Sequence, residues 1–233
     1  MRNLEPEAAT SVLVKEHLAH SLRTAILEGR LSPGQRVVEG AWSREFGVAQ
    51  ASVREAINAL ISEGFLVKDA GRSARVVRYS KQDISHLYEV REALEGQAAR
   101  LTAASGADLT AIRNAVNRMT AAVEHSDVES LVTSDLGFHL ALAHASRNPL
   151  LIDMITRMLV PFFAFILLRV RETGQGAEGW LDDLPRHRRI LDLLAEGDAE
   201  IAAQYTRHCV RLSARSAHDV WADSVLKEVT GKT

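Results

Sequence analysis

The sequence predicts a mainly α-helical protein, with an N-terminal winged helix-turn-helix domain in residues 1–79 and an all-α antiparallel bundle of about six helices in residues 80–233. Three observations support this fold class. Apolar residues recur every three or four positions through most of the chain. Two short helical segments flank a glycine at residue 47, and two extended runs follow them. Charge is uneven, because residues 1–81 carry a net charge of +3 and residues 82–233 a net charge of −5.

The first elements are a helix, a turn and a pair of short helices. Helical spacing of apolar residues over residues 11–28 predicts the first helix, which Gly29 can end. The sequence Leu-Ser-Pro-Gly at residues 31–34 predicts a turn. Residues 41–46 and 51–63 then form two short helices with a glycine in the tight turn between them. This spacing is typical of a helix-turn-helix.

A β-ribbon, the wing, is predicted after the second of these helices. Residues 65–69 and 74–79 are extended in pattern and are separated by a turn that contains glycine. Exposed polar groups on the second helix can read DNA, because glutamine pairs with adenine and arginine with guanine or phosphate. The candidate DNA contacts are Arg44, Gln50, Ser52 and Arg54, with Arg72 and Arg75 at the tip of the ribbon. Each arginine alone could be solvated surface, but the set within a winged motif favours DNA.

The second domain is predicted to be helical throughout. A short linker at residues 79–83 joins it to the first domain, so we expect the two domains to be closely coupled. Apolar periodicity and capping residues predict helices at residues 83–104, 107–124, 127–145, 149–172, 180–195 and 198–228.

Four side chains of this domain are candidate metal ligands. Asp135 and His139 are four residues apart, so on a helix they point the same way, toward an apolar face. His187 and His208 each lie ten residues from a helix break at residues 197–198, and an antiparallel helix pair would bring them level. Three histidines and one aspartate facing inward suit a first-row metal. A lone inward histidine is more often a satisfied core residue, but four coincident placements weigh against that interpretation.

Arg91 is a second candidate site residue. It lies on the apolar stripe of the helix at residues 83–104 and is predicted to point inward, where a guanidinium needs an anion. The anion is either Glu95, one turn along, in a purely structural pair, or an organic-acid effector that Arg91 and the metal hold together. Asn148 is a further candidate for lining that pocket.

Cysteine usage and hydropathy bear on the cellular compartment. Cys209 is the single cysteine, so no disulfide forms within one chain, and we expect a structural thiol. No apolar signal segment is apparent near the N-terminus. The most apolar run, residues 158–168, is shorter than the ~20 residues of a membrane span. We therefore expect a cytoplasmic protein without a membrane partner.

In these motifs the chain resembles the GntR family of bacterial transcription regulators, specifically the FadR-like branch with an FCD effector domain. The resemblance covers nearly the whole chain. The motifs that carry it are Leu-Ser-Pro-Gly at 31–34, Phe-Gly-Val at 46–48, Val-Arg-Glu-Ala-Ile-Asn-Ala-Leu at 53–60, Glu-Gly-Phe-Leu at 63–66, Gly-Arg at 71–72, and the set Asp135, His139, His187 and His208.

The resemblance implies that these last four residues hold a divalent metal, with zinc as the first choice and nickel, manganese or iron as alternatives. It also implies a small carboxylate effector beside the metal. One departure concerns DNA. Where most relatives have Ser-Arg-Thr-Pro, residues 49–52 are Ala-Gln-Ala-Ser, so Gln50 replaces an arginine that commonly meets DNA. Arg54 matches the second DNA-contacting arginine of the family.

We therefore expect a homodimeric, ligand-responsive repressor or activator that binds operator DNA, and not an enzyme. Two alternatives stay open. A metalloenzyme acting on carboxylic acids would use free metal positions to activate water, but no second carboxylate is evident as its general base. Alternatively, the metal itself is the signal, and no organic effector is needed.

Overall fold

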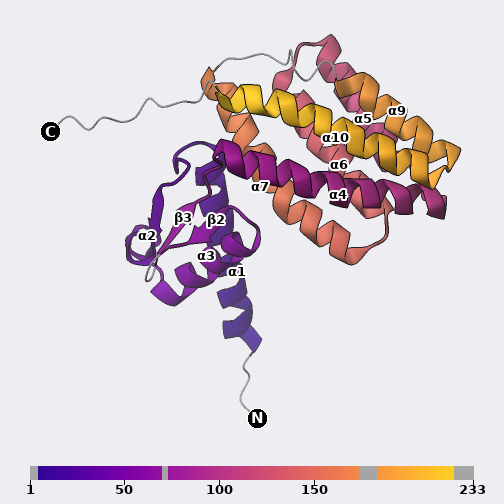
Figure 1. Ribbon diagram of the computed structural model, residues 1–233. Helices are drawn as coiled ribbons and strands as arrows, with labels where there is room; N and C mark the ends of the chain where they lie inside the picture. The colour runs from indigo at the N-terminus through magenta and orange to yellow at the C-terminus, as the bar shows by residue number, and fades with distance from the viewer. Residues whose placement is uncertain (1–4, 70–72, 174–182, 223–233) are drawn as a thin grey trace. The chain divides into compact units, whose positions relative to one another are not determined.

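The computed structural model describes residues 5–69, 73–173 and 183–222, and the chain divides into two units, Met1–Arg78 and Tyr79–Thr233. Most of the described residues are helical, and a small three-stranded sheet belongs to the first unit (Figure 1). The predicted fold class, a winged helix-turn-helix followed by an all-α bundle, is confirmed.

The first unit consists of three helices and a sheet that forms the wing. Strand β3 lies between β1 and β2 and runs antiparallel to both. Helix α1 packs against α3, and both contribute fully buried residues to the core, among them Leu22, Ile26 and Leu60. The elements are α1 Glu5–Leu27, β1 Arg36–Val38, α2 Glu39–Phe46, α3 Gln50–Ser62, β2 Leu66–Lys68 and β3 Ser73–Val76.

A tight turn connects α2 to α3. Gly47 ends α2 with φ at 63°, in the left-handed region that favours glycine. The hydroxyl of Ser43 donates a hydrogen bond to the Val48 carbonyl at 2.6 Å, which holds the turn closed. Ala49 is the N-cap residue of α3, and no side chain caps the helix. Alanine at this position, where the family it resembles usually has serine, therefore leaves the start of α3 without a side-chain cap.

The second unit is a helical bundle whose first helix starts within the predicted linker. Ser80 and Asp83 form a capping box, in which each side chain accepts a hydrogen bond from the backbone N–H of the other. The helix therefore begins at Lys81, and little free linker is left. The helices are α4 Lys81–Ser105, α5 Thr110–Glu124, α6 Val128–Ala145, α7 Pro149–Thr173, α9 Asp183–Glu196 and α10 Ala199–Ala222.

Helices α4 and α10 lie side by side in the bundle (Figure 1). Gly96 is buried in α4 and faces the Arg207 side chain of α10. A Cβ atom at Gly96 would lie 2.6 Å from Cγ and Nε of Arg207, which is closer than side-chain packing allows. The absence of a side chain at Gly96 therefore lets these two helices approach closely.

Helix α7 combines unusual length with strongly apolar composition. Residues Pro149–Arg171 have a window of mean hydropathy 2.0 and meet the length and composition of a membrane span, a test that core helices also pass. The prediction that the apolar run is too short for a span holds only for residues 158–168, because the helix extends beyond them. Phe162, Phe163 and Ile166 are buried in the core of the bundle, as expected of a core helix.

Candidate metal centre

Asp135 and His139 of α6 and His187 of α9 bring three ligand atoms together inside the bundle. These atoms all lie within 4.8 Å of one another, and all three side chains are buried. Nε2 of His187 lies 2.9 Å from Oδ1 of Asp135, and Nε2 of His139 lies 3.2 Å from the same oxygen. The four-residue spacing on α6 thus places Asp135 and His139 on one inward face, as the sequence indicates.

Apolar residues surround these polar groups. Leu131, Phe138 and Leu142 of α6 are buried in the core of the bundle. The Phe138 ring also packs edge-on against the His187 ring, with 4.5 Å between centroids. Because such surroundings solvate charge poorly, the carboxylate and the imidazoles must be satisfied by one another or by an ion.

Hydrogen bonding sets which nitrogen His187 presents to Asp135. Nδ1 of His187 lies 2.7 Å from the backbone carbonyl of Asp183. A carbonyl oxygen only accepts, so we assign the proton to Nδ1. In the neutral ring, Nε2 then faces Asp135 with a lone pair, in the tautomer that metal-binding histidines use.

His139 is held in the same tautomer by two residues of α4. Nη2 of Arg91 lies 3.1 Å from Nε2 of His139 and can donate to that nitrogen when the ring is neutral. Nδ1 of His139 lies 2.7 Å from Oε2 of Glu95, although the angle of this contact falls outside hydrogen-bond geometry. A donor at Nε2 and a carboxylate at Nδ1 both favour the ring with its proton on Nδ1.

The geometry around Asp135 fits a divalent cation. Its Oδ1 is buried and has no hydrogen-bond partner, although two imidazole nitrogens lie close to it. With both rings in the assigned tautomers, three acceptor atoms face one another without a proton between them. A cation satisfies all three, and one carboxylate oxygen with two imidazole nitrogens suits zinc and other first-row metals. Three protein ligands leave coordination positions for water or a further ligand.

His208 does not join this cluster, and its placement on the inward face of α10 was wrong. The His208 side chain is exposed, and so is Ile201, seven residues earlier on α10, at 51%. The buried stripe of α10 instead contains Ala202, Thr206 and Cys209. A shift of one residue turns a side chain by about 100° around a helix, so equal distance from the turn placed His208 level with the site but not toward it.

Burial and charge together perturb the ionisation of the groups around the centre. Burial opposes ionisation of Glu95, but Arg91 and His139 outweigh it and lower the pKa of Glu95 to about 2. Burial likewise opposes a charged His139, yet Glu95 and Asp135 raise its pKa to about 9. The pKa of Asp135 is held well below its usual range, because His139 and His187 overcome the effect of burial. Without a metal, protons on imidazole therefore partly balance the buried carboxylates.

Arg91 points inward, as predicted, and its partner is Glu95. Nε of Arg91 donates to Oε1 of Glu95 at 2.6 Å, and both side chains are almost fully buried. The sequence offered this structural pair as one of two alternatives. It did not indicate that the other oxygen of Glu95 lies 2.7 Å from Nδ1 of His139, so the position of Glu95 beside the cluster could not be predicted from the sequence.

The Asn148 side chain caps the N-terminus of α7. Its side-chain oxygen accepts hydrogen bonds from the backbone N–H groups of Leu150 and Leu151, so it caps the start of α7. Both side-chain hydrogen bonds described for Asn148 belong to this cap. These bonds give Asn148 a role in the fold, and its predicted place in the pocket with Arg91 stays a prediction.

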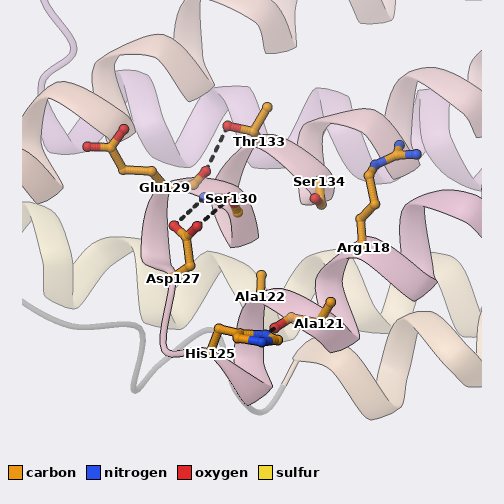
Figure 2. A pocket seen from close by; sticks show the side chains of 9 residues that line it. All are labelled: Arg118, Ala121, Ala122, His125, Asp127, Glu129, Ser130, Thr133 and Ser134. Atoms are coloured by element: carbon orange, nitrogen blue, oxygen red, sulfur yellow. Dashed lines mark hydrogen bonds between the residues drawn. The ribbon is translucent and has the colours of Figure 1, made fainter.

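A separate groove of about 580 Å³ lies on the surface beside α6 (Figure 2). Ser134 lines this groove and precedes Asp135 of the buried cluster, so the two sites share helix α6. Neither Arg91 nor Asn148 lines it. The residues that line it are Arg118, Ala121, Ala122, His125, Asp127, Glu129, Ser130, Thr133 and Ser134.

Two of the predicted DNA contacts lie together beside α2. A Cβ atom at Gly40 would be 3.5 Å from Nε2 of Gln50 and 3.9 Å from Nη1 of Arg44, and both of these side chains are exposed. Ser52, early in α3, is half-buried. These positions leave Arg44 and Gln50 accessible to a partner.

The remaining predicted DNA contacts differ in their surroundings. Arg54 makes a two-pronged ion pair with the buried Glu39, at 2.9 and 2.8 Å. Arg75 lies 3.0 Å from the Asp69 carboxylate and also donates to the Gly34 carbonyl. The position of Arg72 is outside the described residues.

Comparisons with known protein families match both units of the chain. The family model for the FCD domain matches residues 86–212, and that for bacterial regulatory proteins of the gntR family matches residues 14–76. The Glc operon transcriptional activator of Escherichia coli (strain K12) is 28% identical over 226 residues, which cover 88% of this chain and 89% of that protein. The HTH-type transcriptional regulator LutR of Bacillus subtilis (strain 168) is 31% identical over 199 residues, covering 74% and 87%.

Solved structures show the same fold. Escherichia coli McbR/YncC matches with a TM-score of 0.67 at 21% identity, covering 93% of this chain and 98% of that one. A GntR transcriptional regulator from Rhodococcus sp. RHA1 matches with a TM-score of 0.67 at 23% identity, covering 91% and 99%. At these identities the likeness concerns the fold alone.

Proposed function

Because the chain belongs to the GntR family of bacterial regulatory proteins and carries a C-terminal FCD domain, we propose that it is a ligand-responsive transcription regulator that binds operator DNA as a homodimer and senses a small carboxylate in a metal-containing pocket. The relatives and families that it matches are transcriptional regulators, so the protein is a regulator and not the metalloenzyme of the alternative interpretation.

The observation that carries the sensing proposal is a buried guanidinium beside three converging metal ligands. Arg91 is 3% exposed and lies 3.1 Å, through Nη2, from the imidazole of His139. A fixed cation and a metal with free coordination positions are complementary to a carboxylate, which can bond to both. FCD domains bind metal ions and small-molecule effectors, which supports this use of the site.

Asp135, His139 and His187 would hold the metal, and we propose zinc because it accepts mixed imidazole and carboxylate ligands at low coordination number. The bound cation would neutralise the buried carboxylate and offer a further coordination position to the effector. Since an intracellular operator is the proposed partner, we place the protein in the cytoplasm.

DNA reading would use the start of α3 and the adjoining part of α2. Arg44 and Gln50 are exposed and close together, and Arg54 projects from the next turn of α3 with its guanidinium held by Glu39. In a two-fold symmetric dimer, two such surfaces would read the halves of a palindrome. Effector binding can alter DNA affinity only if it favours one arrangement of the protein over another.

The test of DNA binding is selection of sites from a random duplex pool, followed by fluorescence anisotropy on the selected sequence. We expect Arg44→Ala and Gln50→Ala each to weaken binding by about 1–3 kcal/mol, with loss of base preference for Gln50→Ala. Arg157→Ala, a change to an exposed arginine on α7, is the matched control and should leave affinity unchanged. Failure to recover any preferred sequence at moderate salt would refute the proposal.

The partner and effector proposals need two further measurements. Light scattering coupled to size exclusion reports whether the protein is a dimer, and a monomer on operator DNA would contradict the two-fold model. Thermal shift assays with mono-, di- and hydroxycarboxylates on metal-loaded protein report the effector class. We expect stabilisation by at least one class in wild-type protein and none in Arg91→Met.

A second function, in which the metal itself is the signal, is favoured by one observation. Arg91 is already engaged by Glu95 and His139, so the structure does not present it as a free anion site. If the metal is the signal, operator affinity should follow metal concentration with no organic acid present. Under the first proposal, metal alone leaves operator affinity unchanged.

A further inference from the structure

The groove beside α6 contains a nearly buried hydroxyl without a protein partner. Ser134 lines this groove and is 5% exposed. The hydroxyls of Ser130 and Thr133, which also line the groove, each donate to an oxygen of the protein. Within the described part of the chain, the Ser134 hydroxyl makes no such bond. A ligand in the groove that supplies the missing hydrogen bond therefore gains free energy at this position.

A guanidinium lies at the same end of the groove. Nη2 of Arg118, from α5, would be 3.4 Å from a Cβ atom at Gly137, so the absence of a side chain at Gly137 leaves room for the guanidinium. Gly137 follows Ser134 by three residues, and the two therefore share one face of α6. Figure 2 shows Arg118 and Ser134 on the same side of the groove. No carboxylate of the described residues pairs with Arg118, so its charge is available to an anion.

The opposite end of the groove is acidic. Asp127, the N-cap residue of α6, accepts hydrogen bonds from the backbone N–H of Ser130 at 3.0 Å and from its hydroxyl at 2.7 Å. These bonds hold the pKa of Asp127 below its ordinary value, so the carboxylate is ionised at neutral pH. Glu129 also lines the groove, but Arg171 pairs with it. Asp127 can bind a cationic group as well, because each carboxylate oxygen accepts more than one hydrogen bond.

The separation of the two ends sets the length of a suitable ligand. Ser134 and Gly137 follow the N–H group that Asp127 caps by four and seven residues. At ~1.5 Å of rise per residue, the cationic and acidic ends are about 6–10 Å apart along α6. Ala121 and Ala122 of α5 add methyl groups to the lining, which suits a short methylene chain. The groove thus fits a molecule with an anion at one end and a cation at the other.

We infer that the groove beside α6 is a second ligand site, which binds an ω-amino acid with its carboxylate at Arg118 and Ser134 and its ammonium group at Asp127. This inference goes beyond the proposed function, because the ligand binds outside the buried metal centre. An α-amino acid carries both charges on one carbon and is too short to reach both ends. A dicarboxylate would bring a second negative charge to Asp127, and the two like charges would repel each other.

The test is isothermal titration calorimetry of the full-length protein with ε-aminohexanoate, glycine, hexanoate and hexylamine. We expect ε-aminohexanoate to bind about tenfold more tightly than each of the others, because glycine is too short and the other two carry a single charge. Equal affinity for hexanoate, or no binding of ε-aminohexanoate at millimolar concentration, overturns the inference.

Variants of the groove test the proposed contacts. Arg118→Gln and Ser134→Ala should weaken binding of ε-aminohexanoate by about tenfold and about threefold. Asp127→Asn keeps a capping oxygen for α6 but loses the charge, and should weaken binding by about fivefold. Arg113→Gln, which changes another exposed arginine of α5 outside the groove lining, is the matched control and should bind as wild type does. Unchanged affinity in both Arg118→Gln and Asp127→Asn overturns the inference.

One further variant separates the groove from the buried centre. Arg91→Met should bind ε-aminohexanoate as wild type does, because Arg91 does not line the groove. If Arg91→Met loses this binding while Arg118→Gln retains it, the amino acid binds at the buried centre and the inference is overturned. That result would leave the proposed carboxylate sensing and DNA binding intact, since both are measured separately.

Discussion

Helices α4 and α10 approach closely at Gly96. We therefore expect the effect of Gly96→Ala on the free energy of unfolding to change sign when Arg207 is replaced. In wild-type protein, Gly96→Ala places a Cβ 2.6 Å from Cγ and Nε and 3.1 Å from Cδ of Arg207, so the clash runs along the stem of the side chain and not only at its end. Arg207 must then move away from α4. When Arg207 is first replaced by alanine, the same Cβ meets no such obstacle.

The magnitudes follow from two opposing effects. Alanine in place of glycine inside a helix stabilises by about 0.5–1 kcal/mol. Overpacking of a well-filled contact costs about 1–3 kcal/mol. Gly96→Ala alone should therefore destabilise the protein by about 1–2 kcal/mol, whereas in the Arg207→Ala background it should stabilise by about 0.5–1 kcal/mol.

The assay is urea unfolding of wild type, both single variants and the double variant, monitored by circular dichroism. The double-mutant cycle isolates the coupling between the two positions, expected at about 1–3 kcal/mol. Additive effects would refute the reasoning, because they would mean that Arg207 moves aside freely and that glycine is not required for this helix contact.

Three further predictions concern the helical unit. His187→Ala should weaken Co²⁺ binding by on the order of 100-fold, while His208→Ala should change it less than about twofold. If a Co²⁺ titration shows comparable losses for both variants, His208 is a metal ligand after all. In metal-free protein, the raised pKa of His139 means that its charged form stabilises the fold below its ordinary pKa of 6.5, and this contribution is lost as pH rises toward about 9. Urea unfolding at several pH values should show that decline, and a flat profile across this range would contradict it. Asn148→Ala should lower the free energy of unfolding by about 1 kcal/mol through loss of the α7 cap, and should leave the Co²⁺ affinity unchanged. A change in Co²⁺ affinity would instead indicate that Asn148 lies at the metal centre.

Apolar periodicity was enough to predict the helices, because a stripe of buried residues repeats within each one. The same logic placed Asp135 and His139 correctly, since both lie on one helix and their relative direction follows from the helical repeat. His208 was misplaced because its direction depends on the rotation of α10 about its own axis. The distance from a turn does not determine that rotation.

Contacts between separate helices were the least accessible from the sequence. Glu95 was recognised only as a neighbour of Arg91 on α4, and its approach to His139 depends on how α4 packs against α6. The ion pair between Glu39 of α2 and Arg54 of α3 likewise joins two helices, and its residues are fifteen positions apart. Neither pair follows a periodic pattern, so only the folded structure identifies them.

The ion pair between Glu39 and Arg54 also has a dynamic consequence. A free arginine samples many rotamers and loses that freedom when it meets a partner. The two parallel hydrogen bonds from Glu39 already restrict the guanidinium plane of Arg54 to one orientation, so less rotational entropy remains to be lost on association. If Arg54 contacts DNA as proposed, a neutral residue at position 39 should therefore weaken that contact, although residue 39 itself does not touch the DNA.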